Sequence, residues 1–154
     1  MTRPDDGMQV CQRGHVVASS TTMWKQNMRN FCGQCGAATL VSCRNCDWPI
    51  EIQFSFERRE NFALPYCPNY GAPMPWTEKA IADVNEYTAG LSLSPEERSA
   101  ITATVEEFAR GSDSPVVANR WKRLLDKVGP GAAKVLTDVA SKVISEVMKG
   151  HLGY

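Results

Sequence analysis

Residues 31–38 read FCGQCGAA and residues 66–73 read YCPNYGAP, so one pattern occurs twice in the first half of the chain. In the first copy, two cysteines separated by two residues form a turn tight enough to present both sulfurs to one metal ion. Gly36 and Gly71 follow the turn in the two copies. A left-handed glycine there would let the backbone wrap around the ion. The repeated stretch therefore predicts metal-binding knuckles.

Each copy is preceded by a further ligand pair, Cys11-x3-His15 before the first and Cys43-x2-Cys46 before the second. Two units of about 8–38 and 39–76 result, each with the order knuckle, β-prone spacer, knuckle. That order is the plan of a zinc ribbon, in which four sulfur or nitrogen ligands surround zinc as a tetrahedron. We expect each metal ion to take its ligands from knuckles that are consecutive in the sequence. Cys11, His15, Cys32 and Cys35 form the first site, and Cys43, Cys46 and Cys67 form the second.

Tyr70 stands where the repeat requires a fourth cysteine in the second site. A phenol is a poor zinc ligand beside a thiolate because its pKa is near 10. The sequence leaves three outcomes open for this site: zinc completed by water, weakly held zinc, or an empty knuckle stabilised by packing.

The distribution of the six cysteines favours metal over disulfides, because all lie between Cys11 and Cys67. The first residues carry no apolar run of a signal peptide, and no stretch approaches the roughly 18 apolar residues of a membrane span. Lys plus Arg and Asp plus Glu balance at 17 each, which excludes a strong global field toward nucleic acid or an anionic membrane. These features predict a soluble cytoplasmic protein without membrane contact.

Beyond residue 76 the apolar spacing becomes helical. Local signals divide this half into separate helices. A helix start is indicated by Ser94-Pro95 with Glu97, and a helix end by Gly129-Pro130-Gly131. Helices are predicted over 77–89 (with Thr77 as its cap), 95–110, 115–128 and 131–149. Short strands are expected at 15–17, at 39–41 and at 50–56, where apolar and polar residues alternate as in a half-buried strand. The predicted fold class is α+β: a small tandem zinc ribbon of short β-hairpins over 1–76, followed by an α-helical domain over 77–154.

The motif series resembles a bacterial family of unknown function with tandem zinc-ribbon knuckles. The matching motifs are C-x-x-G-H at 11–15, C-x-x-C-G at 32–36, C-x-x-C at 43–46, C-P-N at 67–69 and P-W-T-E at 75–78, together with a helical tail segment at 117–125. The resemblance implies metal binding and a domain boundary near residue 75, and it implies no activity. Tyr70 departs from the family's C-P-N-C-G.

Motifs of metal-dependent or nucleophilic catalysis are missing from the sequence, including H-x-E, G-x-S-x-G, H-E-x-x-H and a phosphate-binding glycine loop. His15 argues against a rubredoxin-like iron site, which takes four cysteines. We therefore expect a non-enzymatic zinc protein that acts as a protein-interaction or adaptor module for an unidentified partner.

Two surfaces of the helical half offer other interpretations. Arg120, Arg123 and Lys127 share one face of the third predicted helix and suggest nucleic-acid binding or a regulatory role, although such a face is usually a solvated flank. The fourth predicted helix is apolar over a wide arc, since Val135, Ile144 and Met148 widen the stripe that Leu136, Val139, Ala140, Val143 and Val147 form. That arc predicts a homo-oligomer formed through this helix.

Overall fold

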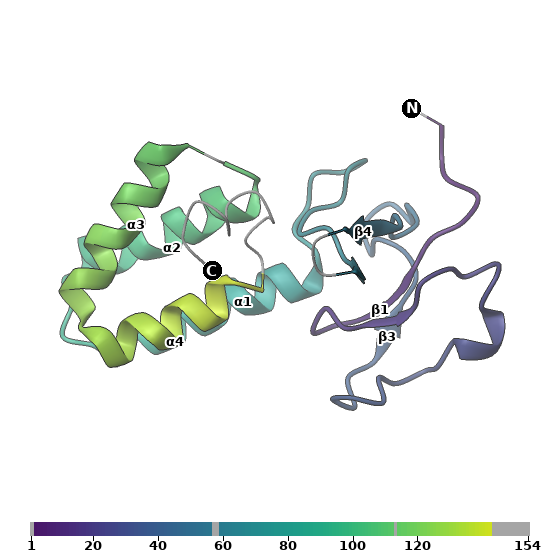
Figure 1. The fold of residues 1–154 in the computed structure, drawn as a ribbon, viewed down its shortest axis with the longest axis horizontal. Coiled ribbons are helices and arrows are strands. Elements are labelled where there is room, and N and C mark those ends of the chain that lie inside the picture. Colours follow the sequence, from purple (N-terminus) through teal and green to yellow (C-terminus); the bar gives the residue numbers. More distant parts are fainter. Residues whose placement is uncertain (1, 57–58, 113, 143–154) are drawn as a thin grey trace. The chain divides into compact units, whose positions relative to one another are not determined.

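The computed structural model describes residues 2–56, 59–112 and 114–142, and it divides into two compact units, Met1–Trp76 and Thr77–Tyr154. The first unit contains short antiparallel strands and the cysteine clusters, and the second contains helices (Figure 1). The predicted α+β class is therefore confirmed. The boundary between the units falls in the first turn of helix α1.

Two small antiparallel sheets organise the first unit. The strands are β1 (Gln9–Cys11), β2 (Val16–Ala18), β3 (Thr39–Leu40), β4 (Gln53–Ser55) and β5 (Glu60–Phe62). The first three form a sheet in the order β2-β1-β3, and the last two form a hairpin; a 3-10 helix, η1 (Lys25–Asn27), follows β2. The strands expected from sequence overlap β2, β3 and β4. Strands β1 and β5 were not predicted, because Gln-Val-Cys and Glu-Asn-Phe each contain a single β-branched or aromatic residue.

Strand β4 exposes the residues that its alternating pattern led us to expect inside. Phe54 is 46% exposed and Phe56, just beyond the strand, is 86% exposed, whereas Ser55 is buried. The alternation thus identified a strand, but burial of its apolar face was the wrong inference. A two-stranded hairpin has no second layer of its own to cover an apolar face.

The hydrophobic core of the first unit is small and includes two metal-ligand candidates, Cys43 and Cys67. The other members of this core cluster are Met8, Val10, Trp48, Ile50, Met74 and Trp76. Trp76 donates its indole N–H to the carbonyl of Leu64 at 3.1 Å. Gly14 lies against the same ring with φ +91°, and a Cβ at that position would come within 3.2 Å of the Trp76 Cβ. Glycine is therefore required both for the backbone conformation and for the close approach.

Four helices form the second unit: α1 (Pro75–Ala89), α2 (Pro95–Ala109), α3 (Pro115–Val128) and α4 (Pro130–Ala140). Ser94 and Glu97 form the capping box that the sequence indicates, with Glu97 N–H donating to Ser94 Oγ at 3.1 Å and Ser94 N–H donating to the Glu97 carboxylate at 3.0 Å. Helix α1 begins two residues before Thr77, which is buried in its first turn, so Thr77 is not the cap.

The fourth helix is shorter in the structure than the predicted range of 131–149. Helix α4 ends at Ala140, and Ser141 and Lys142 form a turn. The rest of the predicted helix lies outside the described residues, and so do Val143, Ile144, Val147 and Met148, on which the homo-oligomer prediction depends. Within the described ranges, no helix has both the length and the apolar character needed to cross a bilayer.

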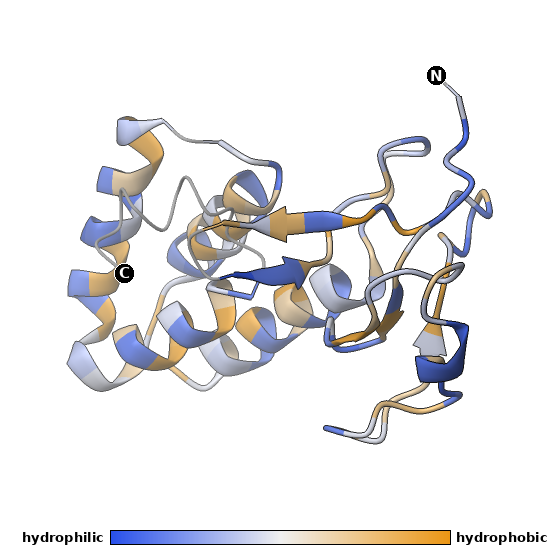
Figure 2. Cartoon of the chain, turned by 45° about the vertical axis from the view of Figure 1, so that its right-hand side comes forward, coloured by the Kyte–Doolittle hydropathy of each residue, from blue (hydrophilic) through white to orange (hydrophobic). Residues whose placement is uncertain are grey.

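The helical core is built from the apolar stripes of α2, α3 and α4, and its fully buried members include Ile101, Val105, Phe108, Trp121 and Leu136. The helices carry hydrophobic residues beside hydrophilic ones along their length (Figure 2). Phe108 of α2 packs edge-to-face on Trp121 of α3, with ring centroids 5.7 Å apart. Such aromatic pairs add to the stabilisation that burial already gives, so this pair contributes to the α2–α3 contact.

Candidate metal centre

The first cluster joins two turns that lie far apart in the sequence. Cys11 ends β1 and His15 directly precedes β2, while Cys32 and Cys35 lie in the turn before β3. The Cys11 sulfur lies 3.6 Å from His15 Nδ1 and 3.7 Å from the Cys35 sulfur, and the Cys32 sulfur lies 3.7 Å from His15 Nδ1. All four donor atoms are within 4.8 Å of one another, so the four residues could hold one metal ion.

These separations can be compared with the edges of a metal-centred tetrahedron. Thiolates held at about 2.3 Å from zinc lie about 3.8 Å apart, and a thiolate and an imidazole nitrogen lie about 3.5 Å apart. The measured 3.6–3.7 Å falls between these two values. A disulfide needs about 2.05 Å between sulfurs, and all six cysteines are free. The donor set therefore fits a four-coordinate ion.

Backbone amides favour the thiolate forms of Cys11 and Cys32 in the first cluster, and burial opposes them. The amides of Arg13 and His15 each point at the Cys11 sulfur at 3.4 Å. Burial raises the pKa of the Cys11 thiol despite these two donors. At Cys32 burial also opposes ionisation, but the amides of Gln34 and Cys35, with the side chains of His15 and Cys35, together lower the pKa to about 6. A thiol with that pKa is largely in the thiolate form that binds metal at neutral pH.

Three knuckles, at residues 32–37, 43–48 and 67–72, share one backbone conformation. In each, the amide of the leading cysteine donates to the carbonyl five residues later at 2.8–2.9 Å, and the amide four residues later donates back to that cysteine at 2.8–2.9 Å. The residue four places after the cysteine has positive φ in all three: Gly36 at 70°, Asp47 at 54° and Gly71 at 74°. The sequence indicated this conformation at the two glycines, and Asp47 adopts it without one.

The second cluster contains three sulfurs, those of Cys43, Cys46 and Cys67, which lie within 4.8 Å of one another. The Cys46 and Cys67 sulfurs are 3.6 Å apart. Cys43 and Cys67 are buried in the core of the unit, whereas Cys46 is half-buried. These three residues could also hold a metal ion. They are the three that the internal repeat assigns to the second site.

Asn69 takes part in the second cluster and was not among the residues singled out from the sequence. Its side chain hydrogen-bonds the Cys46 sulfur, which is the largest influence on the pKa of this thiol and lowers it. The only signal in the sequence is its place between Cys67 and Tyr70 in the knuckle. Tyr70 itself donates its amide to the Cys67 sulfur at 3.4 Å, and 63% of the residue is exposed.

Comparison with known proteins identifies a family for this chain. The model of a family described as uncharacterized protein conserved in bacteria, DUF2321, matches residues 5–152. The chain belongs to this family. The match runs through both units of this DUF2321 protein, and it confirms the expected membership of an uncharacterised bacterial family. No curated protein and no solved structure matches the chain.

The basic residues of α3 lie in a different unit from the cysteine clusters of this DUF2321 chain. Arg120 pairs with Glu107 of α2 at 2.6 Å, and Lys127 pairs with Glu97 of α2 at 3.2 Å. Arg123 is exposed. Two of the three cations that we grouped as a nucleic-acid contact thus face carboxylates of the neighbouring helix.

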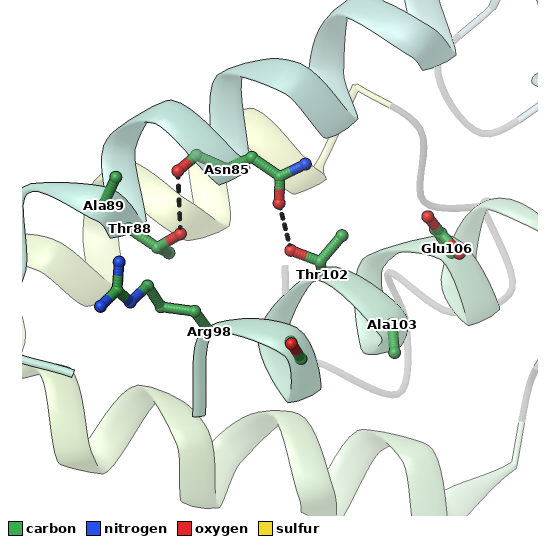
Figure 3. A pocket seen from close by; sticks show the side chains of 8 residues that line it. Asn85, Thr88, Ala89, Arg98, Thr102, Ala103 and Glu106 are labelled. Carbon is green, nitrogen blue, oxygen red and sulfur yellow. Dashed lines mark hydrogen bonds between the residues drawn. The ribbon is translucent and has the colours of Figure 1, made fainter. Parts of the chain in front are cut away.

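A polar pocket of about 360 Å³ in the helical unit was not predicted (Figure 3). Asn85 of α1 accepts a hydrogen bond from the Thr102 hydroxyl at 2.5 Å, and its carbonyl accepts one from Thr88 at 3.2 Å. Arg98 lines the pocket, and its Nε is buried with no hydrogen-bond partner in the described part of the chain. The pocket could not be predicted from the sequence, because its mostly polar lining residues come from two helices and have no motif spacing.

Proposed function

We propose that this chain is a non-enzymatic zinc-binding protein in which the knuckle clusters fold a protein-interaction module that works in the cytoplasm. The observation that carries the proposal is the first cluster, where Cys11, His15, Cys32 and Cys35 place their donor atoms at the edge lengths of a zinc tetrahedron.

The choice of zinc rests on the chemistry of the donors. Three thiolates and one imidazole are a usual structural zinc set, and rubredoxin-like iron takes four thiolates. Calcium and magnesium prefer oxygen ligands, which neither cluster supplies among the described residues. Free thiols at ligand distance also support a reducing compartment.

The zinc has a structural role in this proposal because the first unit has little else to hold it together. Among the described residues its hydrophobic core cluster has eight buried members, two of which are metal-ligand candidates, and its strands are two or three residues long. Small domains with cores of this size depend on metals or disulfides for stability. Binding of zinc would supply folding free energy directly.

The interaction role is supported by apolar side chains on the surface of the first unit. Phe54 and Phe56 of the β4 hairpin stack edge-to-face at 5.2 Å, and both are exposed, as is Ile52. Exposed aromatic groups of this kind act as anchors in protein interfaces. The ion pairs of Arg120 and Lys127 with α2 weigh against the alternative of nucleic-acid binding through α3, because they offset the positive charge of that face.

The salt dependence of partner capture distinguishes protein interaction through the first unit from nucleic-acid binding through α3. Zinc-loaded full-length protein should retain its bound partner when salt is raised from about 0.05 M to about 0.2 M, and the double variant Phe54→Ser, Phe56→Ser should lose it. Arg123→Ala is the control and should capture as well as the parent. Nucleic-acid binding through several phosphate contacts would instead weaken by a factor of about 10³ or more over that salt range. That result, with capture lost in Arg123→Ala, would replace the interaction proposal.

A further inference from the structure

The second cluster differs from the first because only three candidate ligands come together there among the described residues, and exposed knuckle residues surround them. We infer that the metal ion of Cys43, Cys46 and Cys67 keeps one coordination position open and takes a thiolate from a second molecule there. The inference rests on the proposed function, because it requires zinc in this cluster.

Tyr70 occupies a true ligand position by geometry as well as by sequence. The knuckle at 67–72 has the same pair of backbone hydrogen bonds as those at 32–37 and 43–48, and Gly71 has the same positive φ as Gly36. In those two knuckles the residue three places after the leading cysteine is Cys35 or Cys46, and each belongs to a cluster. The third knuckle therefore keeps the shape of a two-ligand turn while supplying one ligand.

Among the described residues, no side chain of the usual metal-binding types, histidine, cysteine or carboxylate, fills the gap. Cys43 and Cys67 are covered by core residues of the unit, among them Trp48 and Met74. The other residues of the two turns are exposed on the surface: Arg44, Asn45, Pro68, Asn69 and Tyr70. The two turns that carry the three cysteines therefore lie at the surface of the unit, within reach of a second molecule.

A thiolate is the donor that this position selects. A zinc ion held by these three thiolates would bind water at its fourth position, and an incoming thiol would replace that water and release its proton to the solvent. Soft sulfur ligands bind such an ion more tightly than water or carboxylate. The exchange involves no electron transfer, so it needs no oxidant or reductant. The thiolate can come from a small cellular thiol or from a cysteine of a partner protein.

Cobalt substitution tests the inference on the full chain, because cobalt bound to thiolates absorbs light in proportion to the number of sulfur ligands. The protein is first titrated with Co²⁺, and two equivalents should bind. Reduced glutathione and the end-blocked peptide Gly-Gly-Cys-Gly-Gly are then added separately. We expect the sulfur charge-transfer absorption of the second ion to rise by about a third, since its thiolates increase from three to four. The tighter of the two probes identifies the source of the thiolate.

Three variants make the result specific. Tyr70→Cys fills the position from within the chain, so it should show the higher absorption without any probe and should not respond to one. Tyr70→Phe should respond as the parent does, which excludes the phenol as the fourth ligand. His151→Ala, at a histidine outside the described residues, should also respond as the parent does.

Two equivalents of cobalt with no response to either thiol would overturn the inference and leave the proposed function standing. A response gained only in His151→Ala or Tyr70→Phe would overturn it as well, because the chain would then complete its own site. Binding of a single equivalent would remove the second ion and the inference with it. Binding of none would contradict the proposed function itself.

Discussion

Replacement of Cys32 by serine is expected to unfold the N-terminal unit and leave the helical unit folded. Cys32 is buried, and its sulfur lies 3.7 Å from His15 Nδ1 in the first cluster. Serine removes a thiolate from a four-ligand site, and a structural zinc contributes folding free energy on the order of 10 kcal/mol. A small core cannot replace that contribution. Two-dimensional NMR of the full chain should show collapsed amide dispersion for residues 2–76 and native signals for α2 and α3.

Gln34→Ser is the matched control, because Gln34 lies in the same knuckle, is exposed, and is not a ligand candidate. It should keep the native spectrum and the metal content of the parent. If Cys32→Ser also kept both, the first cluster would not be a metal site that stabilises the fold.

Replacement of Phe108 by alanine is expected to lower the free energy of unfolding of the helical unit by about 3–5 kcal/mol, because it leaves a cavity in a packed core. Phe108 is fully buried, and its ring packs on Trp121 with centroids 5.7 Å apart. A loss of that size is a large part of the roughly 5–15 kcal/mol that stabilises a typical domain. Urea denaturation followed by far-ultraviolet circular dichroism measures the change.

Val116→Ala provides the comparison for this second unit, since Val116 lies on α3 and is 64% exposed. Its effect should stay within about 0.5 kcal/mol. Equal effects of the two substitutions would mean that the α2–α3 contact is not the core of the unit.

The helices could be predicted from sequence because their boundaries carry local chemistry. Ser94, Pro95 and Glu97 meet their hydrogen-bonding requirements within one turn, so the start of α2 needs no tertiary information. The start of α1 was predicted two residues too late, because the helix begins at Pro75 and Thr77 lies buried in its first turn. Pro75, a residue suited to the first helical position, was the better signal.

The cysteine clusters could also be predicted, because ligand spacing is local and the internal repeat indicates which knuckles combine. The strands were harder. β1 and β5 are defined by hydrogen bonds to partners elsewhere in the chain, and the exposed face of β4 depends on what lies over the hairpin. The same dependence on tertiary structure hid the role of Asn69 beside Cys46 and the pocket between α1 and α2.

Metal content shows most directly whether Cys11, His15, Cys32 and Cys35 form a zinc site. The full chain should be purified without added metal or chelator and examined by elemental analysis together with X-ray absorption at the zinc edge. We expect between one and two zinc ions per chain, with sulfur neighbours at about 2.3 Å and a nitrogen neighbour at about 2.0–2.1 Å. Protein that contains iron, or that contains no metal and is nevertheless fully folded, would contradict this expectation.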